Sequence, residues 1–165
     1  MRNVYLIKSI LSPDLCLCYS DTNGVTVQQV TGCNQNRWMI RRGGDNYCRI
    51  INVSTRKQLF TPNLQESQVL LDKIEHPTSD KAKWSLVKVD RRYCGHDRAN
   101  EFENGYFVMS KIIPQNTGTG SKMIEHEIGI EGGRSKPGTR VILWQHKGIY
   151  CAEPRNQIWT LDKVR

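Results

Sequence analysis

The stretch from Gly129 to Leu161, GIEGGRSKPGTRVILWQHKGIYCAEPRNQIWTL, decides the fold. Two apolar runs, residues 128–130 and 140–144, flank a turn region rich in glycine that also contains proline, which is the pattern of a β-hairpin. A third run, residues 157–161, begins in the polar pair Asn156-Gln157 and contains Trp159. The segment therefore predicts strands joined by turns, and no part of it holds the period of a helix.

The rest of the chain has the same character. Short runs rich in Val, Ile, Leu and Tyr recur between Gly, Pro, Asn and Asp, and none keeps a helical period for long. The predicted strands cover residues 4–7, 15–17, 25–30, 37–41, 47–53, 57–60, 67–71, 84–87, 106–109, 122–130, 140–143 and 157–161. The sequence therefore predicts an all-β protein.

Internal repetition predicts the architecture. Three segments share one order: an aromatic and aliphatic strand, a strand containing Leu, a strand with Val near its start, and a strand that carries Trp38, Trp84 or Trp159. One such unit cannot bury its apolar side chains alone, whereas three around a threefold axis close a barrel and remove free edges. We expect one domain over residues 1–165, with repeats at about 1–43, 44–90 and 104–165 and the three tryptophans in its core.

Composition limits the class of protein. At 165 residues and 38% hydrophobic content the chain fits a globular domain, and no apolar run approaches the roughly 18 residues of a membrane span. Lys8 interrupts the first apolar stretch before the core of a signal peptide can form. No leader is therefore visible, and the compartment stays open because a leader can have been removed.

The formal charge of +8 attracts anionic partners at low salt. The basic residues are scattered and form no run with interleaved aromatics, so nucleic acid is not the favoured partner. A polyanion such as a sulfated glycan remains an alternative.

The six cysteines match no zinc pattern, so neither a metal nor a cofactor is predicted. They are Cys16, Cys18, Cys33, Cys48, Cys94 and Cys151. Cys16 and Cys33 would flank one hairpin and are the best disulfide candidates, with buried free thiols as the alternative.

Catalytic motifs are also missing from the sequence. None of the four histidines lies in Gly-x-Ser-x-Gly, His-Glu-x-x-His or a phosphate loop. The run Cys94-Gly95-His96-Asp97 places a thiol beside an imidazole, but neighbours in sequence seldom have the geometry of nucleophilic catalysis. We therefore predict no enzyme and no catalytic residue.

With these residues in view, the chain resembles the ricin-B-type lectin family. Repeats of that family carry Cys-Leu-Asp-Val, a glycine-rich turn, Gln-Leu-Trp and a closing Asn-Gln-x-Trp, and the closest stretches here are residues 128–133, 137–144 and 156–161. Elsewhere the resemblance rests on strand order, on the tryptophans, and on Cys16 and Cys33, which fall where such lectins often place a disulfide. It implies a non-catalytic β-trefoil that binds a glycan or glycoprotein.

Sugar sites of this family combine a carboxylate, an aromatic face and an amide, which together read hydroxyl groups and the apolar face of a sugar ring. In the third repeat the resemblance implies Trp144 as the aromatic face and Asn156 and Gln157 as the amides. The carboxylate position is Gly129, which is a departure from the family pattern. The third repeat is therefore an altered site or a remnant.

Three further residues can compensate for Gly129. Glu131 lies two residues further on, on the same strand face by the period of two. A different orientation of the ligand can use His146 or Lys147. These three residues complete the predicted ligand-binding set.

The other two repeats depart further from the family pattern. Cys18 and Thr31 stand at the carboxylate and aromatic positions of the first repeat, and Phe60 and Asp72 stand there in the second. Two of the three sites are therefore expected to be lost.

A β-trefoil protease inhibitor is the main alternative, because such inhibitors insert surface loops into a protease. Residues 63–68, 74–80, 93–104 and 114–121 are long enough to serve, although nothing in their sequence marks an inhibitory loop.

Overall fold

The computed structural model describes residues 3–44, 46–62, 68–72, 79–89, 99–111, 125–145 and 154–164. Strands β1 to β12 in this part of the chain are Val4–Ser9, Leu15–Ser20, Gly24–Gln29, Trp38–Arg42, Cys48–Asn52, Gln58–Phe60, Leu70–Asp72, Trp84–Lys88, Tyr106–Ser110, His126–Ile130, Val141–Gln145 and Trp159–Lys163. Five short 3-10 turns, η1 to η5, are Asn34–Asn36, Asp80–Ala82, Ala99–Phe102, Glu131–Gly133 and Pro154–Gln157. The predicted all-β class is confirmed.

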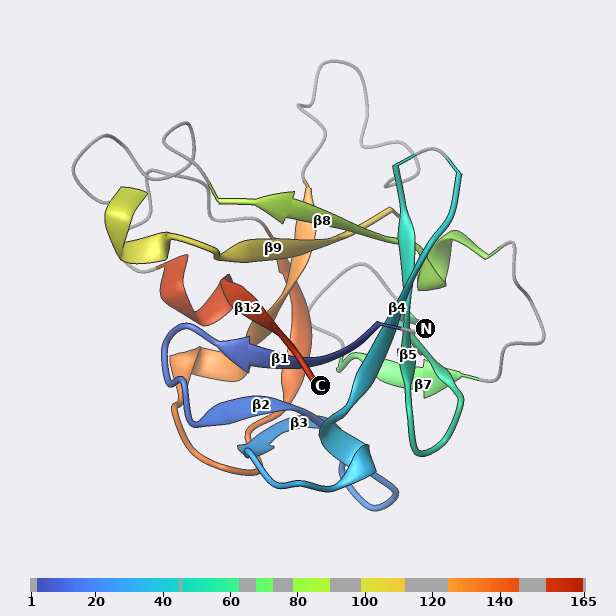
Figure 1. The fold of residues 1–165 in the computed structure, drawn as a ribbon, viewed down its shortest axis with the longest axis horizontal. Helices are drawn as coiled ribbons and strands as arrows, with labels where there is room; N and C mark the ends of the chain where they lie inside the picture. The colour runs from blue at the N-terminus through green and yellow to red at the C-terminus, as the bar shows by residue number, and fades with distance from the viewer. Residues whose placement is uncertain are drawn as a thin grey trace.

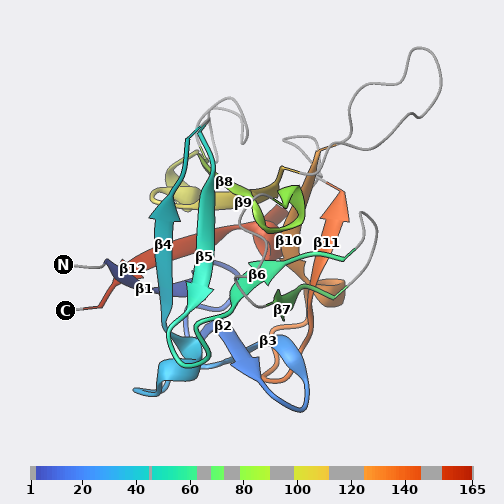
Figure 2. The ribbon, with the colours of Figure 1, turned by 90° about the vertical axis from the view of Figure 1, so that its right-hand side faces the viewer.

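Six of the strands close a barrel (Figures 1 and 2). Their order around it is β1, β4, β5, β8, β9 and β12, and β12 pairs with β1 to complete the ring. The other strands form three hairpins, β2–β3, β6–β7 and β10–β11, and the first strand of each pairs with β1, β5 or β9. Each repeat thus supplies a barrel strand, a hairpin and a second barrel strand, which is the predicted β-trefoil.

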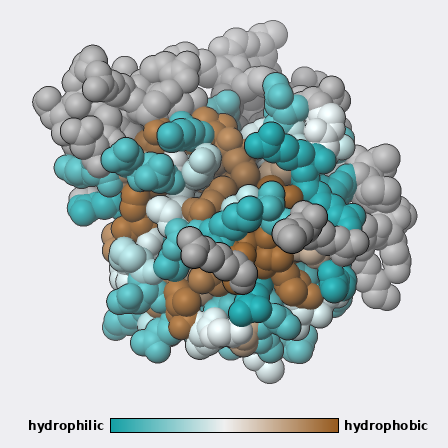
Figure 3. Space-filling model, viewed as in Figure 1, coloured by the Kyte–Doolittle hydropathy of each residue, from teal (hydrophilic) through white to brown (hydrophobic). Residues whose placement is uncertain are grey.

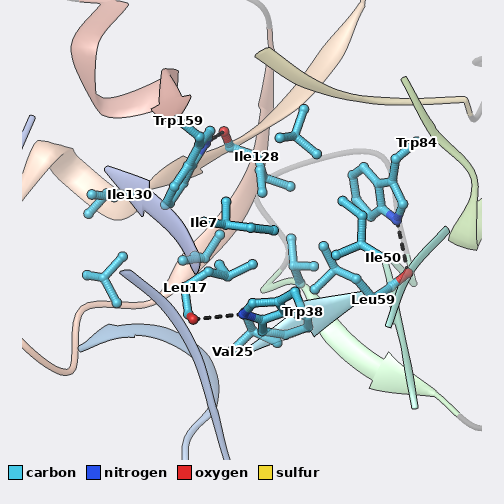
Figure 4. Close-up of a cluster of buried hydrophobic side chains, with 14 of the residues drawn as sticks. Ile7, Leu17, Val25, Trp38, Ile50, Leu59, Trp84, Ile128, Ile130 and Trp159 are labelled. Atoms are coloured by element: carbon cyan, nitrogen blue, oxygen red, sulfur yellow. Dashed lines mark hydrogen bonds between the residues drawn. The ribbon is translucent and has the colours of Figure 1, made fainter. Parts of the chain in front are cut away.

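The three closing tryptophans are fully buried in equivalent places (Figure 4). Each indole Nε1 donates a hydrogen bond to a carbonyl oxygen in the first strand of its own hairpin. The bonds are Trp38 to Leu17 at 2.9 Å, Trp84 to Leu59 at 3.0 Å and Trp159 to Ile128 at 3.1 Å. The core therefore receives the large apolar rings without leaving an indole N–H unsatisfied, and the predicted core role of these residues is confirmed.

A 3-10 turn precedes the tryptophan in each repeat, and the first and third closing strands begin later than the sequence predicts, whereas the second begins at Trp84 as predicted. The predicted strands at 37–41 and 157–161 become Trp38–Arg42 and Trp159–Lys163, following η1 and η5. Side chains of these turns hydrogen-bond to backbone carbonyls, as Asn36 Nδ2 does to Thr31 O at 2.7 Å. Such bonds hold a turn where apolar pattern alone predicts extended chain.

Other differences between the predicted and observed strands lie next to the ranges that the structure does not describe. The strand predicted at 67–71 is observed as Leu70–Asp72, and the one predicted at 122–130 as His126–Ile130, with 122–124 outside the described residues. The loop at 114–121 also lies outside them, and those at 63–68, 74–80 and 93–104 are described only in part. Within the described residues, no helix has the length and apolar character needed to cross a membrane.

Candidate functional site

A pocket of about 720 Å³ opens on the outer face of the β10–β11 hairpin, beside η5. Its lining includes Gly129 from β10, Glu131 from η4, Trp144 from β11 and Asn156 from η5. Three residues of the predicted set, Trp144, Asn156 and Glu131, therefore meet around Gly129. Of the positions that the resemblance aligned with a sugar site, Gly129, Trp144 and Asn156 share one concave surface.

Trp144 forms one wall of the pocket. Ile128 in the facing strand points into the core, so Gly129 and Glu127 belong to the opposite, outer face of the hairpin together with Trp144. The ring of Trp144 is partly exposed, which suits an aromatic platform for an apolar ligand face. Glu127 lies directly across from Trp144 and is fully buried. The family pattern does not mark Glu127, although the strand period alone places it on this face.

Glu131 is held in an ion pair with Arg140. Arg140 Nε donates to Glu131 Oε2 at 3.1 Å, and Arg140 Nη2 donates to Glu131 Oε1. These hydrogen bonds hold the pKa of the Glu131 carboxyl below its ordinary value. Gly132 and Gly133, with φ of 61° and 64°, turn the chain so that this pair can form across the hairpin. The carboxylate is therefore ionised, fixed in place and compensated in charge.

The two amides of the closing motif have different surroundings. Asn156 lines the pocket, and its Nδ2 donates to Ile130 O at 3.2 Å. In contrast to the prediction, Gln157 is fully buried, and its Nε2 donates to Gln145 O at 3.1 Å. Asn36 makes the corresponding bond in the first repeat. Gln157 therefore ties η5 to the end of β11 and does not line the pocket.

A glycine is needed at position 129 because η5 packs closely against the backbone there. A Cβ atom built on Gly129 would lie 2.9 Å from Gln157 Cγ and 3.2 Å from Asn156 O. The first distance is shorter than van der Waals contact, and the second involves backbone that cannot easily move. The pocket therefore has a floor of bare backbone, and the usual carboxylate has no room there.

The remaining members of the predicted set do not join this site. His146 and Lys147 lie outside the described residues. Cys16 and Cys33 are both free thiols, and the predicted alternative of a buried free thiol holds for Cys16 only. Cys16 is buried, which raises its pKa to about 12. Cys33 is exposed, and its Sγ shares a hydrogen bond of 2.7 Å with Thr31 Oγ1.

The thiol of Cys33 differs in acidity from its buried neighbours. Burial alone would raise its pKa, but hydrogen bonds from the Thr31 hydroxyl and from the N–H groups of Gln35 and Asn36 outweigh burial and lower the pKa. Cys18, at the carboxylate position of this repeat, is buried with its pKa raised to about 11. The strand register places Gln28 of this repeat where Trp144 stands in the third, so the predicted assignment of Thr31 to the aromatic position is wrong. The first repeat has neither a carboxylate nor an aromatic ring at these two positions.

The sequence matches no protein-family model and no curated protein. Similar folds occur in solved structures. The designed threefold-symmetric protein ThreeFoil has a TM-score of 0.70 and 18% identity over 98% of this chain and 99% of its own. A ricin B-like lectin from Macrolepiota procera, in complex with lactose, has a TM-score of 0.66 and 18% identity over 98% of this chain and 95% of its own.

An exo-β-1,3-galactanase from Clostridium thermocellum is also similar, with a TM-score of 0.71 and 14% identity over 98% of this chain but only 30% of the enzyme. The likeness therefore covers a minor part of that enzyme and nearly the whole of the lectin. Over nearly its whole length, this chain has the β-trefoil fold that is found in ricin B-like lectins.

Proposed function

We propose that the chain is a non-catalytic module that binds a neutral glycan in the pocket of the third repeat. The observation that carries this proposal is the meeting of a partly exposed Trp144 with the fixed polar groups of Glu131, Arg140 and Asn156 around one pocket. An aromatic face provides dispersion to the C–H face of a sugar, and fixed polar groups read its hydroxyls. The lactose complex of a lectin with the same fold supports this choice.

The charges of the pocket favour a neutral ligand over an acidic one. Glu131 and Arg140 are the charged residues in the described lining and compensate each other, so this part of the rim offers acceptors and donors in balanced charge. The ligand ring would lie against Trp144, with its hydroxyls toward the carboxylate of Glu131 and the guanidinium of Arg140. Since the pKa of Glu131 is lowered, its carboxyl stays ionised near neutral pH and is a poor general acid. Binding therefore fits this pocket better than glycosidic catalysis.

Trp144→Ala is expected to abolish binding to a panel of immobilised neutral glycans at concentrations where the wild-type chain gives a signal. Loss of a central aromatic contact typically weakens binding by more than about 2 kcal/mol, which is roughly thirtyfold. Trp144→Phe keeps an aromatic face and should keep part of the signal.

Three results would contradict the proposal: a wild-type chain that binds no glycan at high concentration, a Trp144→Ala variant that binds as well as wild type, or competition only by acidic sugars. Nanomolar inhibition of a papain-like or trypsin-like protease, unchanged by Trp144→Ala, would instead favour the alternative function, a β-trefoil protease inhibitor.

A further inference from the structure

A second pocket, of about 780 Å³, lies at the end of the barrel where both chain ends and the β4–β5 connection are found. It is separate from the hairpin pocket and shares no lining residue with it. Its lining combines aliphatic residues, three tyrosines and Arg42. The threefold repeat explains how these residues come together.

The residues that come two and four positions after each closing tryptophan form two layers on the inner wall of the barrel. Two residues after each tryptophan stands an aliphatic side chain, which is partly buried and packs on the core: Ile40, Leu86 and Leu161. Four residues after each tryptophan stands an exposed cation: Arg42, Lys88 and Lys163. Because side chains alternate along a strand, both layers lie on the same face as the tryptophans. The barrel thus ends in an apolar layer below three cations, which we call the basal cup.

The neighbouring strands supply the walls of the basal cup. Arg42 pairs with Cys48, Lys88 with Tyr106, and Lys163 with Tyr5. Cys48, Tyr106 and Tyr5 are equivalent positions, because each also pairs with a closing tryptophan. The ring of Tyr47 packs on Gly43 at the rim, since a Cβ on Gly43 would meet it at 2.4 Å. Aromatic side chains therefore stand beside the apolar floor.

Of the three cations, Arg42 lines the second pocket itself, and the strand register places Lys88 and Lys163 on the same inner face beside its lining residues Tyr106 and Tyr5. None of the described residues that line this pocket is acidic, and no carboxylate in the described part of the chain pairs with Arg42, Lys88 or Lys163. Asp162 lies between Leu161 and Lys163 on the opposite strand face, where it binds Lys8 at 2.7 Å. Burial raises the pKa of Cys48 to about 12, and the charge of Arg42 opposes this rise. The guanidinium therefore acts electrostatically on the wall of the cup.

Figure 3 views the molecule from the side of the chain ends. Hydrophobic residues gather near the middle of this face, and hydrophilic residues surround them. A polyanionic chain would be matched better by a stripe of cations than by three cations around a concave apolar floor. The arrangement fits a compact ligand with one anionic end.

We propose that the basal cup binds a small amphipathic anion, meaning an apolar or aromatic body that carries one sulfonate, sulfate, phosphate or carboxylate group. The body packs on Ile40, Leu86 and Leu161 between the tyrosine rings. The anionic group lies among Arg42, Lys88 and Lys163, which attract it together. This site is independent of the glycan pocket.

The fluorescent probe 8-anilinonaphthalene-1-sulfonate tests the site, because it joins an aromatic body to one sulfonate. The wild-type chain should bind one equivalent with enhanced fluorescence. The variant Arg42→Gln, Lys88→Gln, Lys163→Gln should lose at least about tenfold in affinity, since hydrogen bonds to charged groups are stronger than neutral ones. Trp144→Ala should bind the probe as wild type does, which separates this site from the glycan pocket.

The matched control removes three exposed cations outside the cup: Arg41→Gln, Lys111→Gln, Lys136→Gln. Arg41→Gln is the most closely matched of these substitutions, because Arg41 is next to Arg42 in β4 but lies on the opposite face of the strand. The control should keep its affinity within about twofold, as only the general field of the protein changes. Thermal unfolding of both variants checks that each is folded.

Three outcomes would overturn the proposal. The first is a cup variant that binds the probe as tightly as wild type, and the second is a control variant that loses affinity to the same extent. The third is equal binding of N-phenyl-1-naphthylamine, which has the same rings without the sulfonate. Weaker binding of this neutral probe, unchanged in the cup variant, would support the role of the three cations.

Discussion

Trp159→Ala is expected to lower the free energy of unfolding by about 3–5 kcal/mol, as large-to-small changes of a buried tryptophan do. The ring is fully buried among the aliphatic side chains of the core, and its Nε1 holds Ile128 O at 3.1 Å. Removing it leaves a cavity and a buried carbonyl without its donor. Denaturant unfolding followed by far-ultraviolet circular dichroism measures the change.

Trp144→Ala is the control for this measurement, because it makes the same substitution in the same repeat. Trp144 is partly exposed and lies outside the core clusters. Trp144→Ala should lower the free energy of unfolding by no more than about 1 kcal/mol, within the range typical of single substitutions away from the core. Equal losses in the two variants would contradict the assignment of one tryptophan to the core and the other to the ligand pocket.

Gly129→Asp is expected to destabilise the fold by about 1–3 kcal/mol, the usual cost of overpacking, and not to strengthen glycan binding. The change restores the carboxylate of the family pattern, so sequence comparison alone would expect a gain. The structure leaves no room for it, because the new Cβ would lie 2.9 Å from Gln157 Cγ. The aspartate would also approach the carbonyl oxygen of Asn156, which repels it.

Thermal unfolding and glycan titration of Gly129→Asp give the two readouts. Gly44→Ala is the control, because a Cβ on Gly44 meets no atom within 4 Å. It should change the stability by less than about 0.5 kcal/mol. A Gly129→Asp variant that is as stable as wild type and binds glycan more tightly would show that η5 can move away from β10.

The fold could be predicted from the sequence because each of the three repeats shows the same order of strands. Alternating apolar residues mark the strands, and a tryptophan ends each unit at the same place in the order. The starts of the first and third closing strands could not be predicted, because they depend on side-chain hydrogen bonds such as that of Asn36 to Thr31 O. Such bonds are set by the folded turn and leave no trace in the hydrophobic pattern.

The candidate site was predictable only in part, for a similar reason. The resemblance to ricin-B-type lectins implies Trp144 and Asn156, but which of the two adjacent amides faces the pocket is decided by the turn that carries them. The glycine at 129 reflects contact with a segment far along the chain, which a single sequence does not display. The pairing of Glu131 with Arg140 likewise depends on the geometry of the hairpin.

Unlike the glycan pocket, the ring of cations at the basal cup can be found from the sequence alone. Its basic residues look scattered along the chain, yet Arg42, Lys88 and Lys163 each follow a closing tryptophan by four residues. Aligning the repeats on the tryptophans is enough to bring them together. When repeats surround a threefold axis, residues at equivalent positions of the repeats form a ring around that axis.

The indole N–H signals of the four tryptophans provide the most direct test of the proposed glycan site. In a nitrogen–proton correlation spectrum, Trp38, Trp84 and Trp159 should give signals protected from exchange with solvent, since each N–H is buried and hydrogen-bonded. Titration with a glycan that binds the wild-type chain should shift the Trp144 signal progressively and leave the other three nearly unchanged. Saturable glycan binding with an unmoved Trp144 signal would contradict the account.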